Sequence, residues 1–228
     1  YGIAVDEKSV FWSGTGPVSY EGFLSFDGDT WRSFTPQTLP QLGDITSAYQ
    51  IDIGAENSKW ISTFGRGVVH LNSNNTIEHI FNTTNGLAYT ENSSDNQVFV
   101  VVTGVVVDRN GEAWINVRQA ADRNLLAIYS PLTDSFRYAS YPTGTKVPIL
   151  TNVIMDNYGT KWFTSVSDPG NSSPGLVFYD ETKRLPRRIH ANTGWGIITK
   201  DRDGLTDNEV NAVAIDNDGS LWVGTNQG

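Results

Sequence analysis

The sequence predicts an all-β protein, a β-propeller with four blades and a partial fifth. A turn of the pattern Asp-x-x-Gly-x-x-Trp recurs along the chain, its Trp residues lie 48 to 60 residues apart, and short apolar strands flank each turn. Repeats of roughly 40 to 50 residues built from paired strands are typical of propeller blades. Helical repeats are not expected, because no long stretch has the apolar spacing of an amphipathic helix.

The clearest copy of the repeat is the segment from Val210 to Gly228. Val213 and Ile215 alternate with small or polar residues, Asp218-Gly219 supplies residues that tolerate positive φ, and Leu221–Val223 carries the chain back. The segment therefore predicts a hairpin of two strands joined by a tight turn.

Four further copies lie upstream and are less complete. Ser9 stands in the Gly place of the first copy, while Gly54 and Asn57 replace the Asp and the Gly of the second. We expect each Asp to cap backbone N–H groups within its turn, and each Trp to wedge between neighbouring sheets. The residues assigned to this structural role are Asp6, Trp12, Trp60, Asp108, Gly111, Trp114, Asp156, Gly159, Trp162, Asp216, Gly219 and Trp222.

Further strands follow each of the first four Trp hairpins, and this pattern defines the blades. They are expected at 22–26 and 30–34, at 65–71 and 76–81, at 125–129 and 136–138, and at 175–179 before a longer passage, 183–203. The predicted blades are residues 1–49, 50–103, 104–150 and 151–209, with 210–228 as a partial fifth. Because the fifth ends after its second strand, we expect part of a larger propeller or a junction between two propellers.

Composition limits the possible functions. The formal net charge is −9, with 16 Lys and Arg against 25 Asp and Glu, so a nucleic-acid partner is not expected. The chain has no Cys, which removes disulfides and thiolate metal sites. No run of 18 apolar residues occurs, so no membrane span is predicted.

The sequence predicts no catalytic residue, no metal site and no cofactor. Asp216 and Asp201 each begin a segment like the start of a calcium loop, but Gln227 and Ala212 stand where the bidentate Glu is needed. His70, His79 and His190 are the only histidines, and no Ser or carboxylate pattern accompanies them. A propeller lyase stays open as an alternative; it would need a His facing the ring with acidic or metal partners.

One basic cluster stands out in this acidic chain. Four of the 16 Lys and Arg residues fall within 183–188, and His190 follows. Guanidinium groups match phosphate and carboxylate geometry, so Arg184, Arg187, Arg188 and His190 are candidates for binding an anionic partner. The alternative is a solvated outer strand.

Trp195, between two glycines, is expected in an irregular loop where it could stack on a sugar ring or a partner surface.

Residues 203–228 resemble the two-component regulator propeller repeat found in hybrid sensors of Bacteroidetes. Residues 108–116, 152–163 and 175–178, with the irregular repeat spacing, resemble the PorZ-like attachment-complex proteins of type IX secretion. This resemblance implies a non-enzymatic scaffold at the cell surface or in the periplasm, associated with the outer membrane. It implies a role in attaching secreted cargo, with a sortase or other attachment-complex subunits and anionic lipopolysaccharide as partners. The alternative is a periplasmic sensor propeller that recognises a glycan.

Overall fold

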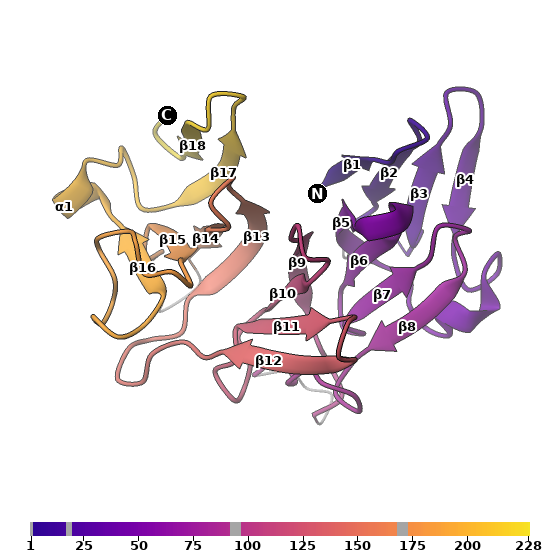
Figure 1. Ribbon diagram of the computed structural model, residues 1–228, viewed down its shortest axis with the longest axis horizontal. Coiled ribbons are helices and arrows are strands. Elements are labelled where there is room, and N and C mark those ends of the chain that lie inside the picture. Colours follow the sequence, from indigo (N-terminus) through magenta and orange to yellow (C-terminus); the bar gives the residue numbers. More distant parts are fainter. Residues whose placement is uncertain (1, 17–19, 92–96, 168–172) are drawn as a thin grey trace. The chain divides into compact units, whose positions relative to one another are not determined.

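The computed structural model describes residues 2–16, 20–91, 97–167 and 173–228, and nearly all of its regular structure is β-strand (Figure 1). In these ranges the helical elements are one α-helix and two 3-10 turns: α1 (Lys200–Asp203), η1 (Pro40–Leu42) and η2 (Ala55–Asn57). The chain forms two compact units, Tyr1–Ala139 and Ser140–Gly228. No helix in the described ranges has the length and apolar character needed to cross a bilayer.

The N-terminal unit contains three antiparallel sheets, each of four strands that follow one another in sequence. The first sheet consists of β1 (Ile3–Val5), β2 (Phe11–Gly14), β3 (Phe23–Phe26) and β4 (Trp31–Phe34). The second consists of β5 (Ala48–Ile53), β6 (Lys59–Thr63), β7 (Val68–Leu71) and β8 (Ile77–Phe81). The third consists of β9 (Val102–Val107), β10 (Ala113–Val117), β11 (Leu126–Ser130) and β12 (Ser135–Ala139).

The C-terminal unit contains a fourth such sheet and an additional hairpin. The sheet consists of β13 (Ile149–Met155), β14 (Lys161–Val166), β15 (Leu176–Tyr179) and β16 (Trp195–Ile198). The hairpin consists of β17 (Val210–Ile215) and β18 (Leu221–Thr225), and it joins β14 through the pair Ser165 and Val210. The all-β propeller arrangement predicted from the repeats is thereby confirmed.

The repeat Trp residues occupy the same register position in successive sheets. Trp12 lies opposite Ala4 on the preceding strand, and Trp60 lies opposite Asp52. Trp114, Trp162 and Trp222 likewise pair with Val106, Ile154 and Ala214. Because side chains alternate between the two faces of a strand, this register sends equivalent residues of different sheets to equivalent faces.

The core of the N-terminal unit forms where sheets pack face to face. Trp12 and Phe23 of the first sheet share a buried cluster with Ile51, Ile61 and Leu71 of the second. Each of these side chains is at most 2% exposed. Burial of large apolar side chains between stacked sheets is the main stabilising contribution here.

The expectation that all five repeat Trp residues are core wedges is wrong for Trp222. Trp12, Trp60 and Trp114 are at most 1% exposed and Trp162 is 7% exposed, whereas Trp222 is 66% exposed. The hairpin turns Val213, Ile215, Leu221 and Val223 toward the core cluster of its own unit. Trp222 lies on the opposite face of β18, where no described strand covers it.

Candidate functional site

The Asp of the repeat turn binds both the turn backbone and the Trp side chain. In the fourth sheet, Asp156 Oδ1 accepts N–H groups from Tyr158 and Thr160, both at 2.9 Å. Asp156 Oδ2 accepts the indole N–H of Trp162 at 3.0 Å. Gly159 has φ of 83°, a conformation that glycine adopts without strain. The same three hydrogen bonds form at Asp6, Asp108 and Asp216.

This network shows that the carboxylates are used by the scaffold. The prediction that each Asp caps backbone N–H groups did not include the indole bond, which the spacing of six residues makes possible. The hydrogen bond from Trp222 is the largest of the causes that lower the pKa of Asp216. Within the described ranges, no group of three or more His, Asp or Glu side chains is arranged to hold a metal ion.

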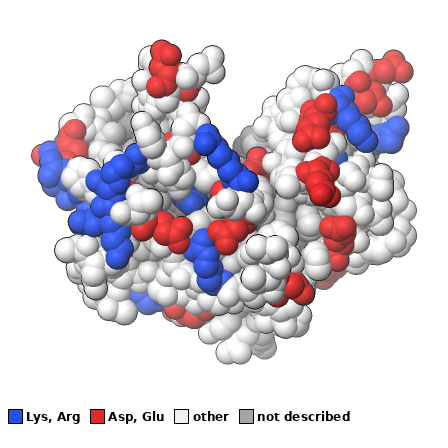
Figure 2. All heavy atoms as spheres, viewed as in Figure 1, with Lys and Arg blue, Asp and Glu red and all other residues white. Residues whose placement is uncertain are grey.

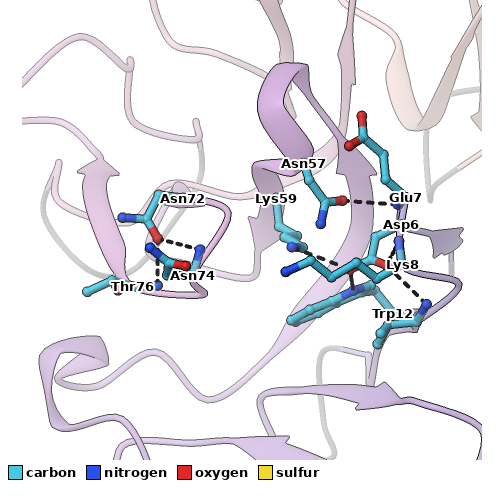
Figure 3. Close-up of polar contacts among 10 residues, drawn as sticks. Asp6, Glu7, Lys8, Trp12, Asn57, Lys59, Asn72, Asn74 and Thr76 are labelled. Atoms are coloured by element: carbon cyan, nitrogen blue, oxygen red, sulfur yellow. Dashed lines mark hydrogen bonds and ion pairs between the residues drawn. The ribbon is translucent and has the colours of Figure 1, made fainter.

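The second repeat, which lacks the Asp, is held by a buried ion pair with the first (Figure 3). Lys59 Nζ lies 3.4 Å from Asp6 Oδ2 and 5.1 Å from the centre of the Trp12 ring system. Asn57, in the Gly place, accepts the backbone N–H of Glu7 at 3.1 Å. Burial lowers the pKa of Lys59, although the charge of Asp6 opposes this effect. These contacts tie the first two sheets together.

The predicted basic cluster lies along the edge of β16 in the C-terminal unit; we call residues 183–190 the basic segment. The backbone N–H of Ile197 donates to the carbonyl of Arg187, and that of Ile189 donates to the carbonyl of Trp195. The segment is therefore an outer edge of the fourth sheet, which was the alternative interpretation of its charge. Lys and Arg side chains gather over this unit (Figure 2).

The structure gives each basic side chain a different environment. The Arg184 guanidinium lies 4.0 Å from the centre of the Tyr158 ring, and both residues are exposed. Arg187 pairs with Asp203 at 2.5 Å, and the half-buried Arg188 donates to the carbonyl of Lys183 at 3.1 Å. His190 is exposed. Arg184 is thus the guanidinium of this segment that is both held by an aromatic ring and directed to solvent.

The expectation that Trp195 lies in an irregular loop, open to a sugar or a partner, is wrong. Trp195 begins β16, is 1% exposed, and packs against the rings of Tyr141, Phe163 and Tyr179 at 5.2 to 5.6 Å. A Cβ at Gly196 would lie 2.0 Å from the Phe178 ring, and one at Gly194 would lie 2.7 Å from the Asp180 carbonyl. The flanking glycines therefore permit close packing around a buried indole.

A polar hollow in the N-terminal unit was not anticipated from the sequence. It has a volume of about 450 Å³, and Glu56, Ser58, His70, Glu78 and Asn110 are among the residues that line it. These residues come from turns and strands of the second and third sheets, so no local sequence pattern links them. We call it the interblade hollow.

Comparison with known proteins finds one family model that is similar to the C-terminal hairpin. Residues 198–227 match the family model described as the two-component regulator propeller. The matched segment contains α1, β17 and β18, and the Asp216 turn with its exposed Trp222. No curated protein sequence matches the chain.

Solved structures share the fold of the whole chain. PorZ, a surface component of the type IX secretion system of Porphyromonas gingivalis, has a TM-score of 0.74 and 16% identity over 98% of this chain. The extracellular domain of a hybrid two-component system of B. thetaiotaomicron has a TM-score of 0.67 and 17% identity over 100% of it. Virginiamycin B lyase of Staphylococcus aureus has a TM-score of 0.65 and 15% identity over 98%.

These similarities concern the fold. The chain spans 31% of the PorZ chain, 26% of the two-component system chain and 62% of the lyase chain. One propeller architecture thus occurs in proteins with a secretion, a sensing and an enzymatic role. Function in this chain has to be argued from its own surface.

Proposed function

We propose that this chain is part of a non-enzymatic propeller outside the cytoplasm that binds an anionic partner through the basic segment. The observation that carries the proposal is the environment of Arg184, whose guanidinium is held on the Tyr158 ring and exposed. A guanidinium fixed in this way can present its N–H groups to a phosphate or carboxylate with little loss of side-chain entropy.

The distribution of charge supports this choice of surface. Residues 1–139 contain 8 Lys and Arg against 15 Asp and Glu, whereas residues 140–228 contain 8 against 10. The acidic excess of the chain therefore lies mainly in the N-terminal unit. An anionic partner meets less repulsion at the C-terminal unit, where the basic segment lies.

The role we propose for this propeller is type IX secretion and the attachment of cargo at the cell surface. Its partners there are a sortase or other attachment-complex subunits, and anionic lipopolysaccharide. The fold shared with PorZ supports this role. A sensor propeller of a hybrid two-component system is the second candidate, and the family match of residues 198–227 favours it. In both candidate roles, secretion and sensing, the basic segment binds an anionic partner.

The test uses a double charge reversal, Lys183→Glu with Arg184→Glu, and vesicles that contain lipopolysaccharide. We expect the unchanged chain to bind these vesicles and not neutral phosphatidylcholine vesicles, with affinity that falls as salt is added. The reversal should lower the affinity by about tenfold or more, because two favourable charge contacts become repulsive.

The matched control is Lys8→Glu with Arg32→Glu, the same change of charge at two exposed residues of the N-terminal unit. Its affinity should stay within about twofold of the unchanged chain, because neither residue belongs to the basic segment and isolated exposed charges contribute little. Equal losses in the two double variants would show that net charge alone governs binding. Unchanged binding by the Lys183 and Arg184 variant would refute the proposal.

A further inference from the structure

The interblade hollow has a smaller counterpart between the first and second sheets. The counterpart has a volume of about 210 Å³ and is lined by Asp6, Trp12 and Lys59, among other residues. Lys59 reaches across from β6 and places its ammonium against Asp6 and Trp12 of the first sheet (Figure 3). Trp60, the equivalent of Trp12, lines the interblade hollow. The repeat therefore holds an ammonium group at this position between its first two sheets.

Both partners of that ion pair are missing at the next contact, between the second and third sheets. Ala113 directly precedes the repeat Trp of the third sheet, as Lys59 does in the second, and Gly54 stands in the place of Asp6. The methyl group of Ala113 is too short to cross between the sheets. The interblade hollow is accordingly larger, at about 450 Å³ against about 210 Å³.

The lining of the interblade hollow is acidic. Glu56 and Glu78 line it and are both exposed, and none of its described lining residues is Lys or Arg. In the described part of the chain, the charged-group contact of Glu78 is with His70, at 3.6 Å. Burial lowers the pKa of His70 to about 4, so this ring is neutral at pH 7 and adds no positive charge. The hollow therefore attracts a cation and repels an anion.

His70 gives the lining a buried polar atom without a partner. The residue is 8% exposed, its ring stacks on the Trp60 indole, and its Nδ1 atom has no hydrogen-bond partner among the described residues. Buried polar atoms in proteins are nearly always paired. With its proton on Nε2, the neutral imidazole has an acceptor at Nδ1, and the carboxylates of Glu56 and Glu78 accept as well. The hollow therefore lacks a donor.

A primary ammonium on an aliphatic chain has the properties that this lining requires. It carries a positive charge and three N–H donors, and it has no acceptor. Ala55 and Pro131 line the hollow beside the polar groups, and their apolar surface can receive the methylene groups of the chain. A volume of about 450 Å³ is within the usual range for small-molecule sites.

We propose that the interblade hollow binds a primary ammonium group on an aliphatic chain, a lysine side chain of a partner protein or a free alkylamine, with Glu56 and Glu78 as its counter-charges. The 3.6 Å between His70 and Glu78 leaves no space for an atom between them, so the ammonium binds from the hollow. The inference does not depend on the scaffold function, because it uses residues of the other unit and a ligand of opposite charge.

The experiment adds n-butylammonium chloride to the ¹⁵N-labelled chain and follows the backbone amides of Ser58 and Asn110 by NMR. We expect saturable shifts, with affinity that falls as salt is added. n-Butanol has a similar chain without the charge, and n-butyltrimethylammonium has the charge without N–H donors. Both should bind at least about fivefold more weakly, because charge-assisted hydrogen bonds are lost.

Glu56→Gln and Glu78→Gln each remove one negative charge at an exposed residue. Each should weaken n-butylammonium binding about threefold to fivefold, and the double variant should weaken it about tenfold or more. The matched control is Glu7→Gln with Glu91→Gln, the same loss of charge at two exposed residues of the N-terminal unit outside the hollow. The control should change the affinity by less than about twofold.

Two further probes distinguish the source of the ammonium. Tighter binding of the peptide acetyl-Ala-Lys-Ala-amide indicates a lysine of a partner protein, and tighter binding of 1,5-diaminopentane indicates a free amine. The proposal fails if n-butylammonium gives no saturable shift, or if n-butanol or n-butyltrimethylammonium binds as tightly. It also fails if the Glu56 and Glu78 double variant binds as the unchanged chain does, or if the control loses as much affinity as the double variant.

Discussion

At the scale of single residues, one carboxylate per repeat joins a turn to the core. Asp6 and Asp216 make the same three hydrogen bonds, to two backbone N–H groups and one indole. Their surroundings differ, because Asp6 is 7% exposed and pairs with the buried Lys59, while the Asp216 turn carries the exposed Trp222. The same local motif should therefore contribute unequally to the free energy of unfolding at the two sites.

Replacing Asp6 with Ala should destabilise the protein much more than replacing Asp216 with Ala. Loss of Asp6 leaves the Lys59 ammonium buried without its counter-charge, a change that costs about 3 to 5 kcal/mol in free energy of unfolding. Adding Lys59→Met to Asp6→Ala should recover part of that loss, since the buried charge is then gone. Urea denaturation measures all three variants, and equal losses for Asp6→Ala and Asp216→Ala would contradict this account.

At the scale of elements, β1 and β5 are equivalent strands with opposite exposure. The register places Ile3 and Ile51 at the same position relative to the repeat Trp of their sheets. Ile51 is 2% exposed in the cluster with Trp12, whereas Ile3 is 71% exposed beside Phe11 and Trp31. What differs is the sheet lying over the residue: the first sheet covers β5, and no described sheet covers that face of β1.

This pair of strands gives a matched test of packing. Ile51→Ala should lower the free energy of unfolding by about 2 to 5 kcal/mol, through lost apolar burial and the cavity left behind. Ile3→Ala should change it by less than about 0.5 kcal/mol, as is usual for exposed positions. Chemical denaturation of the two variants would settle the comparison, and a large loss for Ile3→Ala would mean that β1 is covered in solution.

At the scale of the whole molecule, the response to acid should differ between the two units. The N-terminal unit holds His70, whose pKa burial lowers to about 4, and Asp52, whose pKa burial raises. In the C-terminal unit, burial alone would raise the pKa of Asp180, but hydrogen bonds from Thr182, Leu185 and Arg184 lower it overall. Its stabilising contribution is complete above the ordinary Asp pKa and lost only as the pH falls below that value.

His70 should make the N-terminal unit lose stability at mildly acidic pH. Its folded pKa lies below the unfolded value of 6.5, so the unfolded chain binds more protons and stability falls between pH 6.5 and 4. The loss attributable to His70 should be about 2 kcal/mol at pH 5. Asp52 acts in the opposite direction, so the difference between the unchanged chain and His70→Phe isolates the histidine. Native-state hydrogen exchange of β6 and β7 amides, with β15 amides as the reference, measures this loss of stability. If the unchanged chain and His70→Phe lose stability in parallel as the pH falls, the assignment to His70 is wrong.

The repeat hairpins were predictable from the sequence because they depend on neighbours in the chain. The Asp, the turn Gly and the Trp lie within seven residues of one another, and their spacing is enough to specify a turn, two strands and the face on which the indole lies. The basic segment was equally visible, since its charges are adjacent in sequence. The sequence left two interpretations of this segment open, a site for an anionic partner and a solvated outer strand. Its position along the edge of β16 agrees with the outer strand.

The tertiary structure alone decided which of these residues are buried and which meet. Trp195 looked exposed between glycines and is buried, whereas Trp222 looked buried and is exposed. The Lys59–Asp6 pair and the approach of Asn110 to the hollow beside β7 and β8 were equally invisible. Burial depends on which sheet lies over a face, and contacts between sheets join residues about 50 positions apart, whose pairing no local pattern encodes.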